Sequence, residues 1–459
     1  MKVLKFGGTS VGTIDSLRNV KRIVEDTDSP VIVVVSALGG LTDCLIATAR
    51  KASEGRDDYI LEMDRIRQRH DDIIDALIPE NTKKSELKNN IHGLLAELSN
   101  LYTGVWLLNE LSDRTLNRIV AYGERMSSLI VSAVIDECAH KDSLDFIRTE
   151  QWLGRNIADR QLTEQGIKEA FRELPQKRYV IGGFISRDKD NGDITNLGRG
   201  GSDYTAALVA AALDAEELQI WTDVDGFMTS DPRLVPDARV IQKMTFVESM
   251  ELCSFGAKVI YPPTIYPVFH KNIPIRILNT HNPDAPGTFI SDNSKNLPKC
   301  IRGVSTLRDV TILTVRGNII DAKDSISSRA GNALAKAGLS VLVVEEPIDS
   351  EGYSVSVPTA EADSALSCLK DEFAPESGDG SVTSIEVAGK KAVIAIVREG
   401  INKMEGLGAR LVNNLHRSGI DVRGISDGAS SATIAIVVDD DKAVEALQLT
   451  HDAVINVDI

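Results

Sequence analysis

A lysine that shortly precedes two glycines is the first group in this chain that could do chemistry. Lys5 lies in a short expected strand over residues 2–6. Gly7 and Gly8 follow this strand, and Thr9 and Ser10 stand where a helix is expected to begin. Glycine allows close approach of the backbone to a ligand, and a helix N-terminus attracts phosphate through its free N–H groups. We expect Thr9 and Ser10 to cap that helix. An ordinary strand–turn–helix junction without a ligand is the alternative, and these residues alone leave both interpretations open.

A second glycine-rich loop carries an arginine. Arg199 precedes Gly200 and Gly201, and Ser202 and Asp203 open the next expected helix. The planar guanidinium can bind a carboxylate or a phosphate through two parallel hydrogen bonds. A turn followed by an N-capped helix is the alternative, but an arginine between glycines favours a ligand site.

Three further segments carry charged candidates. Asp223 and Asp225 follow an apolar strand, where carboxylates face the ligand crevice of an open α/β sheet, or merely form a turn. Lys258 follows a glycine turn and could reach a triphosphate, or could be a solvated lysine. Glu124 and Arg125 are expected at the start of an apolar helix. The carboxylate would then be a partner for the helix dipole or a ligand for an ammonium group, and the sequence does not distinguish the two.

These groups require a sheet to position them. Apolar runs over residues 31–35, 178–185 and 217–222 predict buried parallel strands, and helical periodicity covers 16–25 and 203–213. The loop over 36–42, SALGGLT, adds hydroxyls after the first of these strands. Alternating strands and helices predict an open, mostly parallel α/β sheet between helices. A charged helical insertion covers about residues 51–120, with breaks expected near Pro79 and Gly104.

The last third of the chain contains two similar segments. Residues 310–357 and 392–438 each run strand, loop, helix, strand, strand, and residues 376–381 are expected to form the loop between them. This order predicts two small α+β units that share one sheet.

Composition limits the class of protein. The 459 residues suffice for two to four domains, and the net charge of −16 argues against nucleic acid or an acidic membrane as a partner. Five scattered cysteines without CxxC spacing favour reduced thiols, and no metal-ligating set is predicted. The start lacks a signal-peptide pattern, and the longest apolar run, residues 30–38, is far below the roughly 20 residues of a membrane span. We therefore expect a cytoplasmic protein.

Eight motifs occur in the order seen in aspartate kinases. They are KFGGTSVG, SALGGLT, YGERMSS, GGFI, LGRGGSDYTAA, WTDVDG, SDPRLVPDAR and SFGAKVIYPPT. The chain thus resembles the aspartate kinase family of the amino-acid kinase fold, especially the kinase portion of bifunctional aspartokinase–homoserine dehydrogenases. The resemblance implies a catalytic domain over 1–295, followed by ACT-like regulatory domains over 305–375 and 385–459.

The resemblance also implies a reaction and its residues. The γ-phosphoryl of ATP, accompanied by Mg²⁺, would pass to the β-carboxylate of L-aspartate, giving 4-phospho-L-aspartate in the first step of lysine, threonine and methionine biosynthesis. Lys5 and Asp203 would be catalytic. Aspartate would be bound or oriented by Ser36, Thr42, Glu124, Phe184, Arg199 and Ser202. ATP would be bound by Lys5, Gly7, Gly8, Thr222, Asp223, Met228, Arg233, Lys258 and Val259.

Several positions depart from the family's pattern. Met228 replaces a tyrosine, Tyr261 replaces a histidine, and the first ACT-like repeat has VRGNIIDAKDS and EEPIDSE in place of its usual loops. In the second repeat, Asp427 replaces a glutamine. The resemblance implies an amino-acid effector and a homodimer or homotetramer formed through the ACT-like domains. The alternatives are another amino-acid kinase, or a regulatory ACT protein with a decayed kinase domain.

Overall fold

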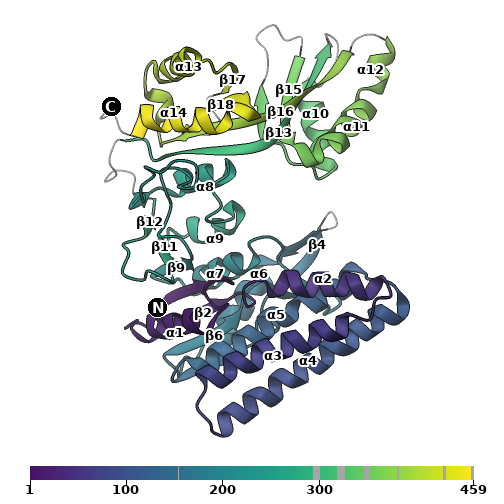
Figure 1. Ribbon diagram of the computed structural model, residues 1–459, viewed down its shortest axis with the longest axis vertical. Helices are drawn as coiled ribbons and strands as arrows, with labels where there is room; N and C mark the ends of the chain where they lie inside the picture. The colour runs from purple at the N-terminus through teal and green to yellow at the C-terminus, as the bar shows by residue number, and fades with distance from the viewer. Residues whose placement is uncertain are drawn as a thin grey trace. The chain divides into compact units, whose positions relative to one another are not determined.

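The computed structural model describes residues 1–152, 155–292, 300–317, 326–345, 352–379, 382–426 and 431–455. Its contacts divide the chain into two compact units (Figure 1). The first comprises Met1–Phe227, Val240–Phe246 and Val259–Lys295. The second comprises Met228–Arg239, Val247–Lys258 and Asn296–Ile459. Two short segments that precede residue 295 therefore pack with the C-terminal part of the chain.

The first unit is built on an eight-stranded sheet with strand order β10-β12-β11-β9-β1-β2-β6-β3. Strands β9, β1, β2 and β6 pair in parallel, as expected for a chain that alternates strands with helices. The five residues of β2 are all buried, which agrees with the continuous β-branched run. The strands are β1 (Lys2–Phe6), β2 (Val31–Val35), β3 (Cys138–Lys141), β6 (Arg178–Gly182), β9 (Glu217–Thr222), β10 (Lys243–Met244), β11 (Ile275–Asn279) and β12 (Thr288–Ile290).

Helices cover both faces of this sheet. Alternate strand residues, among them Leu4 and Phe6, pack with α1 to α5 in one apolar cluster, and α6 and α7 lie on the other side (Figure 1). These helices are α1 (Ile14–Glu25), α2 (Leu41–Ser53), α3 (Tyr59–Leu77), α4 (Thr82–Leu108), α5 (Asp113–Val134), α6 (Arg160–Ala170) and α7 (Gly201–Ala212), with α9 (Tyr266–Phe269) beside α7.

Two local expectations about these helices are wrong. Thr13, not Thr9 or Ser10, caps α1, because its hydroxyl forms a reciprocal capping box with Ser16. The break expected near Pro79 separates α3 from α4, but α4 continues through Gly104 to Leu108. No helix among the described ranges is long and apolar enough to cross a membrane.

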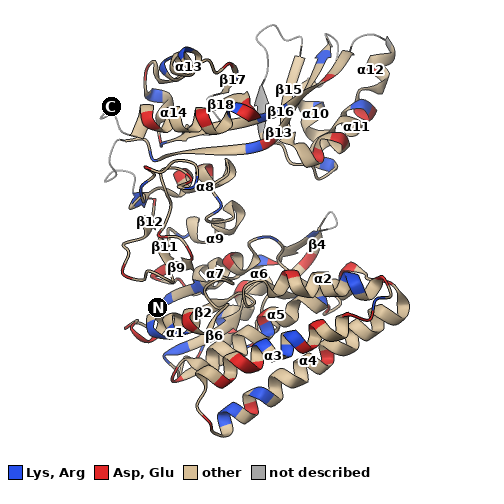
Figure 2. Ribbon diagram, viewed as in Figure 1, with Lys and Arg blue, Asp and Glu red and all other residues tan. Residues whose placement is uncertain are grey.

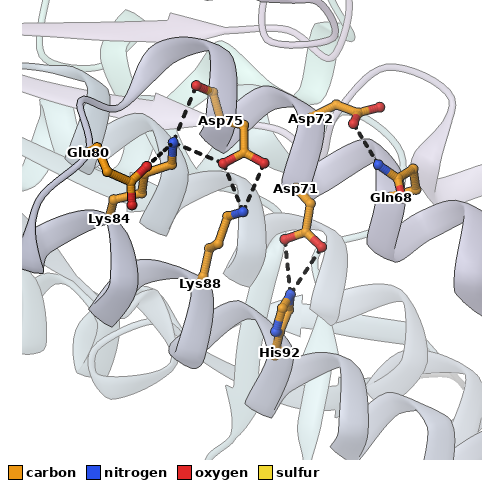
Figure 3. A network of polar contacts seen from close by, with 8 residues as sticks. All are labelled: Gln68, Asp71, Asp72, Asp75, Glu80, Lys84, Lys88 and His92. Carbon is orange, nitrogen blue, oxygen red and sulfur yellow. Dashed lines mark hydrogen bonds and ion pairs between the residues drawn. The ribbon is translucent and has the colours of Figure 1, made fainter.

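The α3–α4 hairpin is joined by surface charges and by the largely buried Lys84, which together we call the α3–α4 charge network (Figure 3). Lys84 Nζ lies 2.9 Å and Lys88 Nζ 2.8 Å from Asp75 Oδ1, and His92 Nε2 lies 2.9 Å from Asp71 Oδ1. Charges of both signs extend along both helices (Figure 2). Such pairs in water add little to stability individually.

A smaller four-stranded sheet follows the order β5-β4-β7-β8. The strand expected over 178–185 is therefore divided: β6 ends at Gly182 in the large sheet, and the next strand begins at Ile185 in the small one. Its strands are β4 (Arg148–Trp152), β5 (Arg155–Ala158), β7 (Ile185–Asp188) and β8 (Ile194–Asn196). Phe184, at the switch, has a φ of 65°, an uncommon left-handed conformation for an aromatic residue.

The second unit contains a six-stranded sheet with strand order β14-β15-β13-β16-β18-β17, antiparallel throughout. The two segments predicted as repeats share this sheet, and their first strands, β13 and β16, pair along its centre. Each repeat also adds a final helix. The elements are β13 (Gly303–Gly317), α10 (Ile326–Lys336), β14 (Val343–Glu345), β15 (Gly352–Pro358), α11 (Ala362–Glu372), α12 (Ala374–Asp379), β16 (Val382–Val397), α13 (Leu407–Arg417), β17 (Val422–Ser426), β18 (Thr433–Asp439) and α14 (Ala443–Ile455).

One expectation about the second unit is wrong, and several others concern residues outside the described ranges. The segment expected as a loop from residue 376 is helical as far as Asp379, at the end of α12, and residues 380–381 lie outside the described ranges. Asp427, most of VRGNIIDAKDS and nearly all of EEPIDSE also lie outside them.

The two short segments of the second unit are fixed to its sheet by buried contacts. Helix α8 (Phe246–Ser254) carries Glu248, whose carboxylate lies 3.0 Å from Arg302 Nε, with both side chains almost fully buried. Thr229 Oγ1 lies 3.0 Å from Nε2 of the buried His451, and Val235 belongs to the apolar core that includes α14. These segments are therefore part of the second unit's core.

Candidate active site

An ion pair between β1 and α7 forms the centre of the site. Lys5 Nζ lies 2.7 Å from Asp203 Oδ1, and the two side chains are 12% and 14% exposed. Leu4 and Phe6 pack on the opposite face of the sheet, so strand alternation directs Lys5 toward α7. A lysine on a central parallel strand is costly unless it is paired, which favours a functional role.

The two glycine loops after β1 and β2 touch backbone to backbone. A Cβ atom on Gly8 would lie 3.1 Å from the Ala37 carbonyl oxygen, and one on Gly39 would lie 3.0 Å from the Gly8 carbonyl oxygen. Gly7 has more room, and its N–H donates to the Trp221 carbonyl at 3.2 Å. The glycines therefore bring loop 7–12 and loop 36–40 together beside Lys5.

Glu124 is the most perturbed acid of the site. Its side chain is 3% exposed, Oε1 accepts a hydrogen bond of 3.1 Å from the Ala37 N–H, and Oε2 has no partner among the described residues. Burial raises its pKa to about 8, although the Ala37 N–H and the nearby Lys5 act in the opposite direction. An ammonium group is the kind of donor that the unpaired oxygen could accept.

Its place in the helix corrects a prediction. Glu124 lies in the interior of α5, which begins at Asp113, and not at a helix start. The interaction with a helix N-terminus that was considered for this carboxylate is therefore excluded, because the dipole effect is limited to the first turn.

Most of the other residues expected to bind or orient aspartate lie within residues 36–42, in α7 and at the β6–β7 switch. Ser36 accepts a hydrogen bond of 2.8 Å at its carbonyl from Ser127 Oγ, and Thr42 lies in the first turn of α2. Ser202, in the first turn of α7, packs so closely on Gly183 that a Cβ there would lie 2.7 Å from Ser202 Cβ. Phe184 N donates to Thr205 Oγ1 of the same helix at 3.0 Å. The β6–β7 switch and α7 are thus held together at the site.

Arg199 is exposed and faces a separate cavity. Its guanidinium carbon lies 5.9 Å from the centroid of the Tyr261 ring, and both residues line a cavity of about 370 Å³ with Tyr204 and Trp152. Gly200 has a left-handed φ of 70°, and a Cβ on it would lie 2.7 Å from Tyr261 Cβ. Tyrosine at position 261 therefore stacks on the arginine that is expected to bind a carboxylate.

The expected nucleotide residues are divided between the units. Thr222 ends β9 and its Oγ1 lies 3.2 Å from Asp223 Oδ1, and both belong with Val259 to the first unit. Met228, Arg233 and Lys258 belong to the second unit. The guanidinium of Arg233 binds Asp231 through two hydrogen bonds of 2.9 and 2.6 Å.

Two residues that contact the site loops were missed by the sequence reasoning. Ser127 lies one helical turn after Glu124, so the spacing could have placed it on the same face. Arg69, in α3, donates to carbonyls of both glycine loops. No local signal distinguishes it from the other arginines of the charged insertion.

Comparison with known proteins shows the family to which the chain belongs. The model of the amino acid kinase family matches residues 1–279, and that of the ACT domain matches 394–454. The chain is 32% identical to the bifunctional aspartokinase/homoserine dehydrogenase of Haemophilus influenzae, over 99% of the chain and 57% of that protein. It is 30% identical to lysine-sensitive aspartokinase 3 of Escherichia coli, over 98% of both.

A solved structure extends the comparison. The crystal structure of E. coli aspartokinase III in complex with aspartate and ADP matches with a TM-score of 0.82 and 29% identity, over 98% of this chain and 99% of that one. The chain therefore belongs to the amino acid kinase family and, within it, to the aspartokinases. It spans only 57% and 50% of the bifunctional relatives from H. influenzae and Arabidopsis thaliana.

Proposed function

We propose that this chain transfers the γ-phosphoryl group of ATP to the β-carboxylate of L-aspartate, giving 4-phospho-L-aspartate, the first step toward lysine, threonine and methionine. The observation that carries the proposal is the Lys5–Asp203 ion pair at 2.7 Å, beside glycine loops in contact. Family membership supports the same reaction.

The chemistry needs positive charge more than it needs a base. A carboxylate is ionised at pH 7, so the attacking oxygen requires no proton removal. The barrier arises from bringing two anions together, and positioning and charge neutralisation lower it. In the proposal Lys5 neutralises charge on the transferring phosphoryl, and Asp203 holds the lysine in place until ATP binds.

Aspartate itself would be recognised at both ends. Glu124 Oε2, buried and unpaired among the described residues, would accept the substrate ammonium, and Arg199 would bind the α-carboxylate. Ser36, Thr42, Phe184 and Ser202 would shape the space between them. The strained φ of 65° at Phe184 is consistent with a functional position.

The nucleotide would be held by Gly7, Gly8, Thr222, Asp223, Met228, Arg233, Lys258 and Val259. The described residues contain no group of three or more His, Cys, Asp and Glu that could hold a metal ion. In the proposal Mg²⁺ would accompany the phosphates of ATP.

The proposal also assigns regulation and subunit assembly to the second unit. The two ACT-like repeats would bind an amino-acid effector and join subunits into a dimer or tetramer in the cytoplasm. One supporting observation is the E. coli aspartokinase III structure that contains lysine and aspartate, which matches with a TM-score of 0.75 and 28% identity.

An ATP-dependent hydroxamate assay tests the reaction. Hydroxylamine traps an acyl phosphate, so we expect aspartyl hydroxamate to form with L-aspartate and not with L-glutamate. Product with glutamate alone would indicate another amino-acid kinase. No product with either substrate, from a folded chain, would indicate a regulatory protein with a decayed kinase domain.

A further inference from the structure

One arginine of the helical insertion contacts both glycine loops of the site. Arg69 lies in α3 and is half-buried. Its Nη2 donates to the Gly12 carbonyl at 3.1 Å and to the Gly39 carbonyl at 2.9 Å. A single guanidinium nitrogen therefore bridges loop 7–12, after β1, and loop 36–40, after β2.

The two bridged loops depend on close contact. A Cβ atom on Gly12 would lie 3.0 Å from the Gly8 carbonyl oxygen and 3.2 Å from the Gly39 nitrogen. Such distances leave little freedom for one loop to move without the other. A donor that binds a carbonyl of each loop fixes their relative position at this contact.

The second loop is also held from the opposite helix. Ala37 N–H donates to Glu124 Oε1 at 3.1 Å, and Ser127 Oγ donates to the Ser36 carbonyl at 2.8 Å. Loop 36–40 is thus attached to α5 at its start and to α3, through Arg69, at Gly39. Ala37 lies only two positions before Gly39. Movement of Gly39 would therefore displace the Ala37 N–H group, which binds Glu124.

Helix α3 is a firm support for this contact. Three carboxylates on the turns after Arg69, those of Asp71, Asp72 and Asp75, are bound by side chains of α3 and α4 (Figure 3). His70, the next residue, is fully buried, and its Nδ1 lies 2.7 Å from the Ile66 carbonyl. Polar contacts and buried packing therefore hold the hairpin in place near Arg69.

We infer that Arg69 is a positioning residue for phosphoryl transfer: its guanidinium sets the phosphate-binding loop and the acceptor-substrate loop at their working separation and adds positive charge behind both. This inference rests on the proposed function. It also gives the charged insertion a role, because α3 supplies a cation to the site without contacting a substrate.

The test compares Arg69→Ala, Arg69→Lys and Arg67→Ala in the full chain, with kcat measured at saturating ATP and aspartate. Arg67 is the matched control, because it lies on the same helix, is about half exposed and has its Nη1 3.7 Å from Asp64. A misplacement of about 1 Å can cost up to about 100-fold in rate. We expect kcat to fall at least about tenfold in Arg69→Ala and to stay unchanged in Arg67→Ala.

Rescue separates positioning from folding. Arg69→Lys should recover part of the rate, and guanidinium chloride at concentrations far below denaturing ones should restore Arg69→Ala, whereas equal sodium chloride should not. An Arg69→Ala enzyme with the kcat of Arg67→Ala would overturn the inference. So would a loss of rate that neither lysine nor guanidinium ion reduces.

Hydrogen exchange provides a readout independent of catalysis and of the alanine variant. In Arg69→Gln, amides of residues 7–12 and 37–41 should exchange faster than in the unchanged chain, and in Arg67→Gln they should not. If the chain shows no aspartate-dependent activity, the proposed function fails while this arm still tests the bridge. Unchanged exchange in Arg69→Gln would contradict it.

Discussion

Two groups of charged residues in the first unit differ in what surrounds them. In the α3–α4 charge network, Asp75 is about half exposed and lies within 2.9 Å of two lysine ammonium groups. At the candidate active site, Glu124 is 3% exposed and one of its oxygens has no partner among the described residues. Asp75 is thus half exposed and paired twice, whereas Glu124 is buried and incompletely paired.

This difference in burial and pairing indicates which charged residues are available to bind a ligand. Exposed ion pairs stabilise a protein by about 0.2–1 kcal/mol each, whereas a buried polar group without a partner is destabilising. A chain selected only for stability would replace Glu124 with an apolar residue. The Lys5–Asp203 pair lies between these extremes, since both side chains are mostly buried but they pair with each other.

The largest effect should come from breaking the buried ion pair. Lys5→Ala is expected to lower kcat by about 10²–10³-fold, because a preorganised charge at the transferring phosphoryl is lost. Hydroxamate formation at saturating substrates measures it. Lys21→Ala, at a surface lysine paired with Glu25 and Asp136, is the control and should leave kcat unchanged. A rise in KM with an unchanged kcat would contradict the role assigned to Lys5.

The exposed arginine beside Tyr261 should affect binding more than chemistry. Arg199→Ala is expected to raise KM for aspartate by about 10- to 100-fold with a smaller change in kcat, because a charge-assisted hydrogen bond contributes about 1.5–3 kcal/mol. Initial rates over a range of aspartate concentrations measure both constants. If kcat falls by about 10- to 100-fold instead and KM is unchanged, Arg199 interacts with the transition state and not with bound aspartate alone.

Glu124 should affect stability in a way that depends on pH. Its folded pKa of about 8 lies above the ordinary 4.5, so the native state binds this proton more tightly than the unfolded chain. Stability from this group is therefore present below pH 4.5 and is lost as the pH rises to about 8. Glu124→Gln should gain a few degrees in Tm over the unchanged chain at pH 8 and less at pH 5, about 2–4 °C for each kcal/mol.

Two further measurements accompany that variant. Glu164→Gln, at a half-exposed glutamate paired with Lys168, should show no such dependence on pH. Glu124→Gln should also lose most aspartate binding, because a neutral amide replaces the carboxylate that would bind the substrate ammonium. A variant whose Tm gain is the same at both pH values would show that ionisation of Glu124 is not the cause.

The smallest effect should come from the α3–α4 charge network. Asp75→Asn is expected to leave kcat unchanged and to lower Tm by no more than about 2 °C. Hydrogen bonds from Lys88 and Lys84 lower the pKa of Asp75, so its small contribution is present above its unfolded pKa and is lost as the pH falls. In 1 M salt the difference from the unchanged chain should disappear. A large loss of activity would show that the support that α3 gives to Arg69 depends on the ion pairs of Asp75.

Much of the fold follows from local sequence. The strands at 31–35 and 217–222 are predicted correctly, because continuous β-branched or apolar runs have few other stable arrangements. The order of the two C-terminal repeats is also predicted. The cap of α1 is not, because Thr9, Ser10 and Thr13 are all good capping residues and only the reciprocal bond to Ser16 selects the last.

The site was less accessible from sequence, because it depends on contacts between distant residues. Nothing near Glu124 indicates that it lies in mid-helix with an unpaired oxygen, and nothing near Arg69 indicates the two carbonyls that it binds. Phe184 was named through the family resemblance, but its left-handed φ depends on Thr205 and the switch between two sheets. Local patterns predict elements, and long-range packing decides burial and pairing.

The assignment of residues 228–239 and 247–258 to the second unit affects how the protein can be made and divided. During synthesis these segments emerge before Arg302 and His451, the groups that pair with Glu248 and Thr229. Glu248 can therefore meet Arg302 only after about 54 further residues are made, and Thr229 can meet His451 only when nearly the whole chain has been made. A chain cut after residue 292 would keep them permanently exposed, with apolar Val235 uncovered, and a protease should cleave it there first. The first 292 residues consequently do not form a self-contained folding unit.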